Sequence, residues 1–263
     1  MGEIKTMVKG IPIVMVAFGT TTKALDTYKF MDSIFRNRFG DNEILWAYSS
    51  RMVRDRIKAR KGVELKHPHQ VLSELAVKQY EWVVVQSVHL IWGHEFYRMV
   101  EEVNKMSIRV SIGLPLLTDP KDYCDTAKAL FRFVKHDEKI ASIFVGHGTD
   151  HPSWTSYLAL ERAFRKRLGK NTFVGVVEGV PSREEVIDAV TSGGFKKAHL
   201  IPLMVVAGTH FREDLVWEEG SWKQALEQRG IPVTVEDKGI GYVKEIVEIF
   251  CTHIEEALDA ISF

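Results

Sequence analysis

The sequence contains little cysteine and no long apolar run. Its 263 residues include two cysteines, Cys124 and Cys251, and neither belongs to a CxxC pair, so we expect two free thiols in a reducing compartment. No stretch reaches the ~18–20 consecutive apolar residues that a membrane span needs. The opening residues, MGEIKTMVKG, also lack the apolar core and the cleavage site of a signal peptide. These absences argue against a membrane protein and predict a cytoplasmic one.

An excess of charge of either sign is also missing. Lysine plus arginine and aspartate plus glutamate both number 35, so the composition gives no indication of a nucleic-acid partner or an anionic membrane partner. Several common motifs are absent as well: there is no GxGxxG after a strand, no GxxxxGK[ST], no GxSxG and no HExxH. The sequence therefore lacks the usual signatures of dinucleotide binding, P-loop phosphate binding, serine hydrolysis and zinc proteolysis.

What the chain does have is an alternation of short β-branched apolar runs with longer amphipathic stretches. This alternation is typical of βαβ units and of a parallel sheet, and a hydrophobic content of 45% is sufficient for a large core. The predicted strands cover residues 12–17, 43–48, 82–88, 108–113, 140–145, 172–178, 198–205 and 232–236.

Four strands followed by four strands indicate an internal duplication. VMVAFGT at 14–20 resembles SIFVGHGT at 142–149, and VVVQSVHLIWGHEF at 83–96 resembles HLIPLMVVAGTHF at 199–211. We therefore predict an α/β fold of two pseudo-symmetric halves, residues 1–136 and 137–263, with an active-site cleft between them. The apolar face of the last predicted helix, near 242–260, suits a subunit interface as well as the core, which leaves a homo-oligomer open.

Three predicted strands in the second half each lead into a potential metal ligand. His147 lies between two glycines after one strand, Glu178 follows FVGVV, and His210 ends LIPLMVVAGTH. The carboxyl ends of parallel strands face one crevice, where ligands bind. Two imidazoles and one carboxylate suit a divalent transition metal and leave coordination positions open. The sequence therefore predicts a metal site made of His147, Glu178 and His210.

Four further residues are candidates for substrate binding. His151 lies four residues beyond His147, within reach of the same cavity. His89 and Glu95 occupy the equivalent loop of the first half, where Glu95 aligns with His210. Arg54 belongs to a basic helix after the second strand, and it would pair with a substrate that carries several carboxylates.

Nearly the whole chain resembles the anaerobic cobaltochelatases of the class II chelatase superfamily. The resemblance rests on VAFGT at 16–20, AYSSRMVRDRI at 47–57, VQSVHLIWGHEF at 85–96, GLPLLTDPKDY at 113–123, FVGHGTDH at 144–151, VGVVEG at 174–179 and LIPLMVVAGTHF at 200–211. One departure is His94, where the family pattern leads us to expect an acidic or polar residue.

The resemblance implies a specific activity and a specific fold. It implies an enzyme, a sirohydrochlorin cobaltochelatase or metal–tetrapyrrole lyase, that inserts Co²⁺ into sirohydrochlorin or factor II during cobalamin synthesis. The family's histidines fall on His147 and His210, and its acidic ligand falls on Glu178. It also implies that each half is a four-stranded parallel sheet flanked by helices, with the active site between the halves.

Several alternatives stay open at this point. Fe²⁺ for sirohaem, Ni²⁺ or Zn²⁺ would also suit the ligand set, because ligand softness does not separate these ions well. A zinc-type metallohydrolase uses the same set of two histidines and a glutamate, and predicts tightly held Zn²⁺ and hydrolysis of esters or amides. A non-catalytic metal or haem carrier predicts tight retention without turnover.

Overall fold

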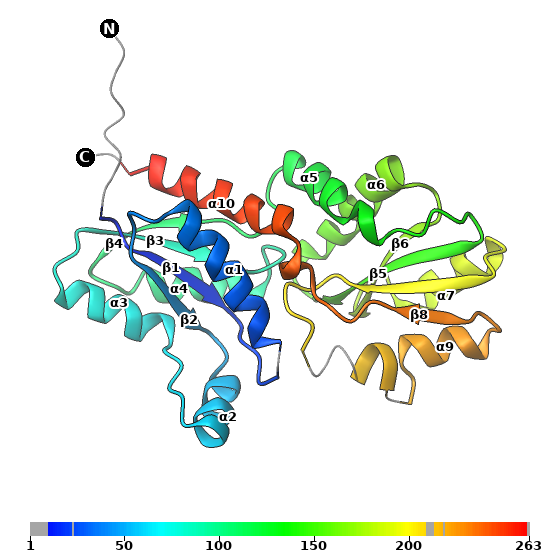
Figure 1. Cartoon of the computed structure of the whole chain (residues 1–263), viewed down its shortest axis with the longest axis horizontal. Coiled ribbons are helices and arrows are strands. Elements are labelled where there is room, and N and C mark those ends of the chain that lie inside the picture. The colour runs from blue at the N-terminus through cyan, green and yellow to red at the C-terminus, as the bar shows by residue number, and fades with distance from the viewer. Residues whose placement is uncertain (1–9, 23, 209–212, 218, 262–263) are drawn as a thin grey trace, which may run out of the picture.

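The computed structural model describes residues 10–22, 24–208, 213–217 and 219–261. Within these residues the strands form two four-stranded parallel sheets, with orders β2-β1-β3-β4 and β6-β5-β7-β8 (Figure 1). The strands are β1 (Ile13–Ala17), β2 (Ile44–Tyr48), β3 (Trp82–Ser87), β4 (Arg109–Gly113), β5 (Ile140–Gly148), β6 (Thr172–Glu178), β7 (Lys197–Pro202) and β8 (Val233–Val235). The predicted fold of two similar four-stranded halves is confirmed.

The strands have the composition expected of a sheet that is covered on both faces. The central strands β1 and β5 are buried almost from end to end, and the run Val83–Val85 in β3 is fully buried. All eight predicted strands are found, with ends that differ by at most three residues. β5 continues to Gly148 because that residue still pairs with Glu178, and β7 ends early, at Pro202, which has no N–H to donate to a neighbour.

Helices cover both sheets. They are α1 (Leu25–Arg38), α2 (Arg51–Lys61), α3 (Pro68–Val77), α4 (His94–Val103), α5 (Pro120–Leu130), α6 (Thr155–Leu168), α7 (Arg183–Ser192), α9 (Trp222–Gln228) and α10 (Lys244–Asp259). Short 3₁₀ turns, η1 (Phe131–Phe133), η2 (Pro152–Trp154) and η4 (Ile240–Tyr242), and a π-helical turn, η3 (Glu213–Trp217), complete the described elements. Among the described residues, no helix combines the length and the apolar content needed to cross a bilayer.

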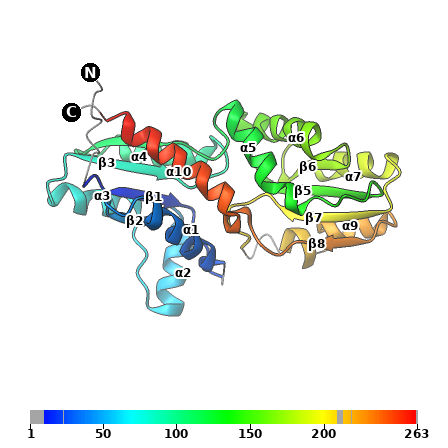
Figure 2. The ribbon, with the colours of Figure 1, turned by 45° about the horizontal axis from the view of Figure 1, so that its top comes forward.

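The helices do not follow the same division of the chain as the strands. The predicted boundary at residue 136 falls between β4 and β5 and so separates the two sheets. However, α10 returns from the end of the chain to pack against β3, β4 and α1, while α5 packs against α6 of the second half (Figures 1 and 2). The boundary itself stays a prediction, and α10 belongs by packing to the first sheet.

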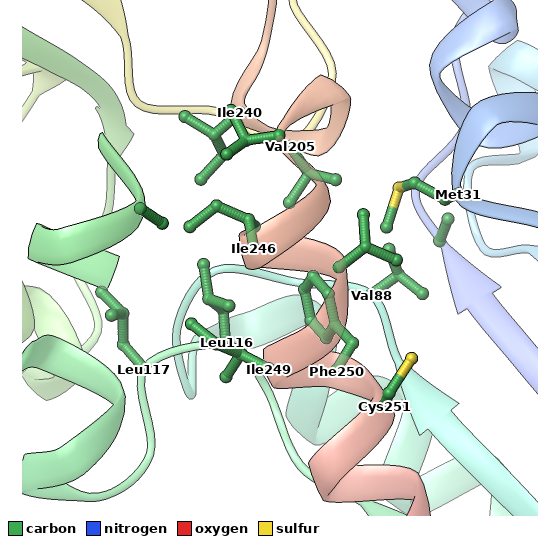
Figure 3. Close-up of a cluster of buried hydrophobic side chains, with 14 of the residues drawn as sticks. Met31, Val88, Leu116, Leu117, Val205, Ile240, Ile246, Ile249, Phe250 and Cys251 are labelled. Atoms are coloured by element: carbon green, nitrogen blue, oxygen red, sulfur yellow. The ribbon is translucent and has the colours of Figure 1, made fainter. Parts of the chain in front are cut away.

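One hydrophobic cluster runs through both halves, and α10 lies at its centre. Figure 3 shows Ile246 and Phe250 of α10 among side chains from α1, from the loop after β4 and from the segment after β7. The same cluster includes Phe144 of β5. The apolar face of α10 is therefore used in the core of the chain itself, and it provides no argument for a subunit interface.

A buried ion pair adds a polar contact to this helix. His253 of α10 lies 3.3 Å from the Asp122 carboxylate at the start of α5, and its Nδ1 lies 3.0 Å from the carbonyl oxygen of Leu114. Both side chains are nearly inaccessible, at 3% and 7% exposure. Burial by itself would lower the pKa of His253, but the hydrogen bond and charge of Asp122 raise it overall. Burial would raise the pKa of Asp122, but hydrogen bonds from His253 and the Asp119 amide hold it below its usual value.

We expect the His253→Leu variant to lose about 3 kcal/mol of unfolding free energy, because it leaves a buried carboxylate without its partner. The contribution of His253 to the unfolding free energy is fully present below its ordinary pKa of 6.5. It is lost as pH rises through the higher pKa that His253 has in the folded protein. The contribution of Asp122 to the unfolding free energy is fully present above its ordinary pKa of 3.8. It is lost as pH falls through the lower pKa that Asp122 has in the folded protein. Denaturant titrations from pH 3 to 9 measure the unfolding free energy of both proteins. The loss in the variant should be largest between pH 3.8 and 6.5.

The matched control is Arg132→Met. Arg132 also pairs with α10, through Glu245, but both side chains are more than half exposed. We expect its removal to change the unfolding free energy by less than about 1 kcal/mol. An equal loss in both variants, or a loss in His253→Leu that does not vary with pH, would show that the buried pair is not responsible.

Candidate functional site

The two halves build the same turn at the carboxyl ends of their central strands. After β1, Gly19 has a φ of 98° and its N–H donates to the Tyr28 hydroxyl at 3.3 Å. In β5, Gly148 has a φ of 91° and its N–H donates to the Tyr157 hydroxyl at 3.2 Å. In each case the tyrosine lies nine residues after the glycine. Glycine suits both positions because a positive φ is strained for other residues.

The tyrosines are buried hydrogen-bonding supports for these turns. Burial raises the pKa of Tyr157 to about 12 and raises that of Tyr28 as well. Both phenols therefore stay protonated and neutral at physiological pH. The residues that precede the two glycines, Phe18 and His147, consequently hold equivalent places in the two halves, and both side chains are exposed.

His147 and Glu178 are brought to the same edge of the second sheet. Gly148 pairs with Glu178 in the parallel register of β5 and β6. A Cβ atom on Gly148 would collide with the carbonyl oxygen of Glu178, so this glycine permits the close approach of the two strand ends. Both His147 and Glu178 are exposed, and within the described part of the chain neither side chain has a hydrogen bond or an ion pair. An unengaged imidazole and carboxylate at one edge are suited to holding a metal ion.

The third predicted ligand, His210, lies outside the described residues. The described chain reaches Gly208, two residues before it, and a Cβ on Gly208 would lie 3.2 Å from the Thr20 hydroxyl of the first half. Within the described ranges, no group of three or more histidine, cysteine, aspartate or glutamate side chains is arranged to hold a metal. The complete ligand set of His147, Glu178 and His210 therefore stays a prediction.

The first half presents a cavity of about 250 Å³ at its own carboxyl edge. Phe18, Ser49, Arg51, Glu95, Arg98 and Met99 are among the residues that line it. The Glu95 carboxylate accepts hydrogen bonds from the Ser49 hydroxyl at 3.0 Å and from Arg98 at 2.8 Å. Glu95 is thus held in a fixed orientation at the wall of a cavity.

His89 is near enough to Glu95 to feel its charge, and it is uncharged at neutral pH. Burial lowers its pKa to about 4, and the nearby charge of Glu95 only partly opposes the effect. Its Nδ1 lies 2.8 Å from the Ser87 hydroxyl. Its Nε2 is buried and has no hydrogen-bond partner among the residues that the structure describes. His89 is thus an uncharged polar side chain that burial makes harder to protonate.

The two carboxyl edges meet at the loop that follows His147. His94, the first residue of α4, lies with its Nε2 2.7 Å from the Asp150 carboxylate. The rings of His94 and Tyr97 lie 5.2 and 5.1 Å from that of His151. His94, the departure from the family pattern, therefore joins the first half to the loop after the predicted ligand.

Two predicted substrate residues have structural partners of their own. The Nδ1 of His151 accepts a hydrogen bond from the Ser153 amide at 3.2 Å and caps the turn η2. Arg54 donates to the carbonyl oxygens of Tyr48 and Ser49 at 2.6 and 3.1 Å, at the end of β2. These contacts fix both side chains at the carboxyl edges, and a substrate role for either one stays a prediction.

With this geometry established, comparison with known proteins identifies the family. The sequence model described as "Cobalt chelatase (CbiK)" matches residues 11–259. The chain belongs to the cobalt chelatase (CbiK) family. It is therefore an enzyme of the chelatase class that handles a divalent metal, as the resemblance in the sequence implied.

Curated relatives of this chelatase cover most of its length. It is 32% identical to the sirohydrochlorin cobaltochelatase of Salmonella typhimurium, over 83% of this chain and 84% of the relative. It is 30% identical to the sirohydrochlorin cobaltochelatase CbiKC of Nitratidesulfovibrio vulgaris, over 95% of this chain and 91% of the relative.

Solved structures share the chelatase fold at lower identity. The sirohydrochlorin chelatase SirB from Bacillus subtilis subspecies spizizenii, in complex with cobalt, aligns with a TM-score of 0.65 and 15% identity, over 95% of this chain and 96% of that chain. SirB from Bacillus subtilis with Fe³⁺ aligns with a TM-score of 0.67 and 14% identity, over 95% of both chains. At this identity the likeness concerns the fold alone.

The two supporting tyrosines were missed in the sequence, although a signal for them exists. Both follow the Gly-Thr turn at the same interval, in TTTKALDTY and TDHPSWTSY. Phe18 carries no local signal of its own, since a phenylalanine after an apolar strand is also common in a core. The equivalence is visible only when the two glycine turns are compared: Phe18 precedes Gly19 in the first half of the chelatase, and His147 precedes Gly148 in the second half.

We expect the Tyr157→Phe variant of the chelatase to bind Co²⁺ about 10-fold more weakly, because the turn that positions His147 loses its support. The Gly148 N–H, which is partly buried, would also lose its partner, which should lower the unfolding free energy by about 1 kcal/mol. Tyr28→Phe is the matched control, since it removes the same hydrogen bond from the other half. It should lose similar stability and keep its Co²⁺ affinity; equal Co²⁺ affinities in the two variants would refute the positioning role.

Proposed function

We propose that this enzyme inserts Co²⁺ into sirohydrochlorin, or its factor II form, in anaerobic cobalamin biosynthesis. The observation that carries the proposal is the presence of His147 and Glu178 at one sheet edge in a chain that matches the cobalt chelatase family over residues 11–259. The names of the relatives from Salmonella typhimurium and Nitratidesulfovibrio vulgaris support the choice of metal and ring. The cytoplasmic location expected from the sequence belongs to the same proposal.

In this proposal the metal is a substrate that the protein must release. His147 and His210 hold and deliver the ion, while Glu178 ligates it or accepts a pyrrole proton. Three protein ligands leave coordination positions for solvent or for the ring nitrogens. A closed four-ligand site would retain its ion, whereas an open site of exposed side chains suits transfer.

Metal insertion also requires acceptors for two protons. One divalent ion replaces the protons of two pyrrole N–H groups, so both must leave as the metal–nitrogen bonds form. Glu95 lines the cavity of the first half, where the Ser49 hydroxyl and Arg98 hold its carboxylate. We assign proton acceptance to Glu95.

The rim of the ring carries carboxylates, and cationic side chains are present beside the proposed cleft. Arg51 and Arg98 line the cavity of the first half, and Arg54 lies at the end of β2. Arginine is suited to carboxylates because its planar guanidinium offers paired donors. Of the three, Arg51 has the most exposed guanidinium, with a side chain that is 88% accessible.

We expect His147→Ala to abolish metallation while the protein stays folded, because one of the predicted metal ligands is removed. The measurement is an anaerobic absorbance assay with purified protein, sirohydrochlorin and Co²⁺, repeated with Fe²⁺, Ni²⁺ and Zn²⁺. His136→Ala is the control, since His136 is exposed at the boundary between the halves and packs against Phe131. Wild-type rates no faster than metal plus ring alone would reject a chelatase, and a faster rate with Fe²⁺ than with Co²⁺ would reject the choice of metal.

We expect Glu95→Gln to slow insertion by about 100-fold, since loss of a general base has an effect of that order. Co²⁺ affinity should stay nearly unchanged, because Glu95 belongs to the other half. Single-turnover absorbance with pre-bound ring separates the chemical step from binding. Glu102→Gln is the comparison, because Glu102 lines the same cavity but pairs with His67. A similar slowing in both variants would assign the effect to the charge of the cavity and not to proton transfer.

A further inference from the structure

Phe18 is an exposed aromatic side chain at the place of a predicted metal ligand. Its side chain is 44% exposed, although it follows the fully buried strand β1. A single exposed apolar residue needs no special explanation. The position is what distinguishes Phe18: the repeated glycine turn, with its tyrosine support, holds Phe18 in the first half where it holds His147 in the second.

The cavity beside Phe18 has apolar, cationic and acidic side chains in its wall. Phe18, Pro68 and Met99 line this cavity of about 250 Å³, and Arg51, Arg98, Glu95 and Glu102 also contribute to it. Arg98 is paired with Glu95, which leaves Arg51 as the cation best placed to meet an anionic ligand. Arg51 is 3.6 Å from its neighbour Asp55, and that pair is largely exposed, so solvent screens it strongly. An apolar surface with a cation at its margin fits a flat ring that bears carboxylates on its rim.

Two contacts between the halves bring the edge that carries Phe18 to the edge that carries His147. Thr20, two residues after Phe18, lies beside Gly208, two residues before His210. His94 also contacts Asp150, three residues after His147. These two contacts bring the carboxyl edges of the two halves together, and Phe18 and His147 each lie at one of those edges.

We propose that Phe18 is the surface on which one face of the tetrapyrrole rests while the second half presents the metal to the ring, and that Arg51 pairs with a rim carboxylate. This inference rests on the proposed function and adds a substrate-contacting residue to it. An aromatic ring against a flat macrocycle provides a large contact area together with stacking. The internal duplication has thus produced a metal-binding side chain in one half and a ring-binding side chain in the other.

The test is a binding titration with metal-free sirohydrochlorin, followed anaerobically by absorbance. Phe18→Ala should weaken binding by about 10-fold, in line with the loss of an aromatic contact. Phe18→Tyr should restore most of the affinity because it keeps the ring. Co²⁺ binding by Phe18→Ala should equal that of wild type, and in turnover the KM for the ring should rise more than the KM for Co²⁺.

The matched control is Phe131→Ala. Phe131 is 47% exposed, close to the value for Phe18, but it lies in η1 against His136. The Phe131→Ala variant should bind sirohydrochlorin with the affinity of the wild-type protein. Equal ring affinity in wild type and Phe18→Ala would overturn the role of Phe18 and leave the chelatase proposal standing. Failure of the wild-type protein to bind the ring would overturn both.

Discussion

The packing of α10 is the constraint on which the cleft depends. This helix comes from the end of the chain, yet it lies on the first sheet, against β3 and β4, and also contacts α5. Its buried residues Ile246 and Phe250 belong to a cluster that includes Phe144 of the second sheet. Because the chain returns to its first half after completing the second, the two carboxyl edges are held in a fixed relation. A ring and a metal that approach from opposite halves require such a relation, since small misplacements of reacting groups reduce rates strongly.

Duplication gave the two halves one scaffold and left them with different chemistry. The glycine with a positive φ and its tyrosine support are present in both halves, so the backbone at these turns is shared. The side chain before the glycine is not shared: it is an imidazole in one half and a phenyl ring in the other. The fold therefore supplies the position, and in the proposed reaction the residue at that position decides whether it serves the metal or the ring.

The shared sheet edge of His147 and Glu178 could be predicted from the sequence because the signals for it are local. His147 and Glu178 directly follow runs of buried, β-branched residues, and the rule for the ends of parallel strands brings them to one edge. The partners of the other residues could not be predicted in this way. Arg54 looked like a free cation on a basic helix, but it binds the carbonyl oxygens at the end of β2. His253 is paired with Asp122, 131 positions away, and no local pattern in the sequence indicates that pairing.

The sequence by itself determined the α/β class, the eight strands with ends within three residues, and the similarity of the two halves. These follow from apolar periodicity and from short repeated motifs, which act over a few residues. Only the tertiary structure decided that α10 packs on the first sheet, that Phe18 stands in the place of His147, and that His94 reaches Asp150 across the halves. These relations join segments that are far apart in the chain, and they depend on which surfaces the whole fold buries together.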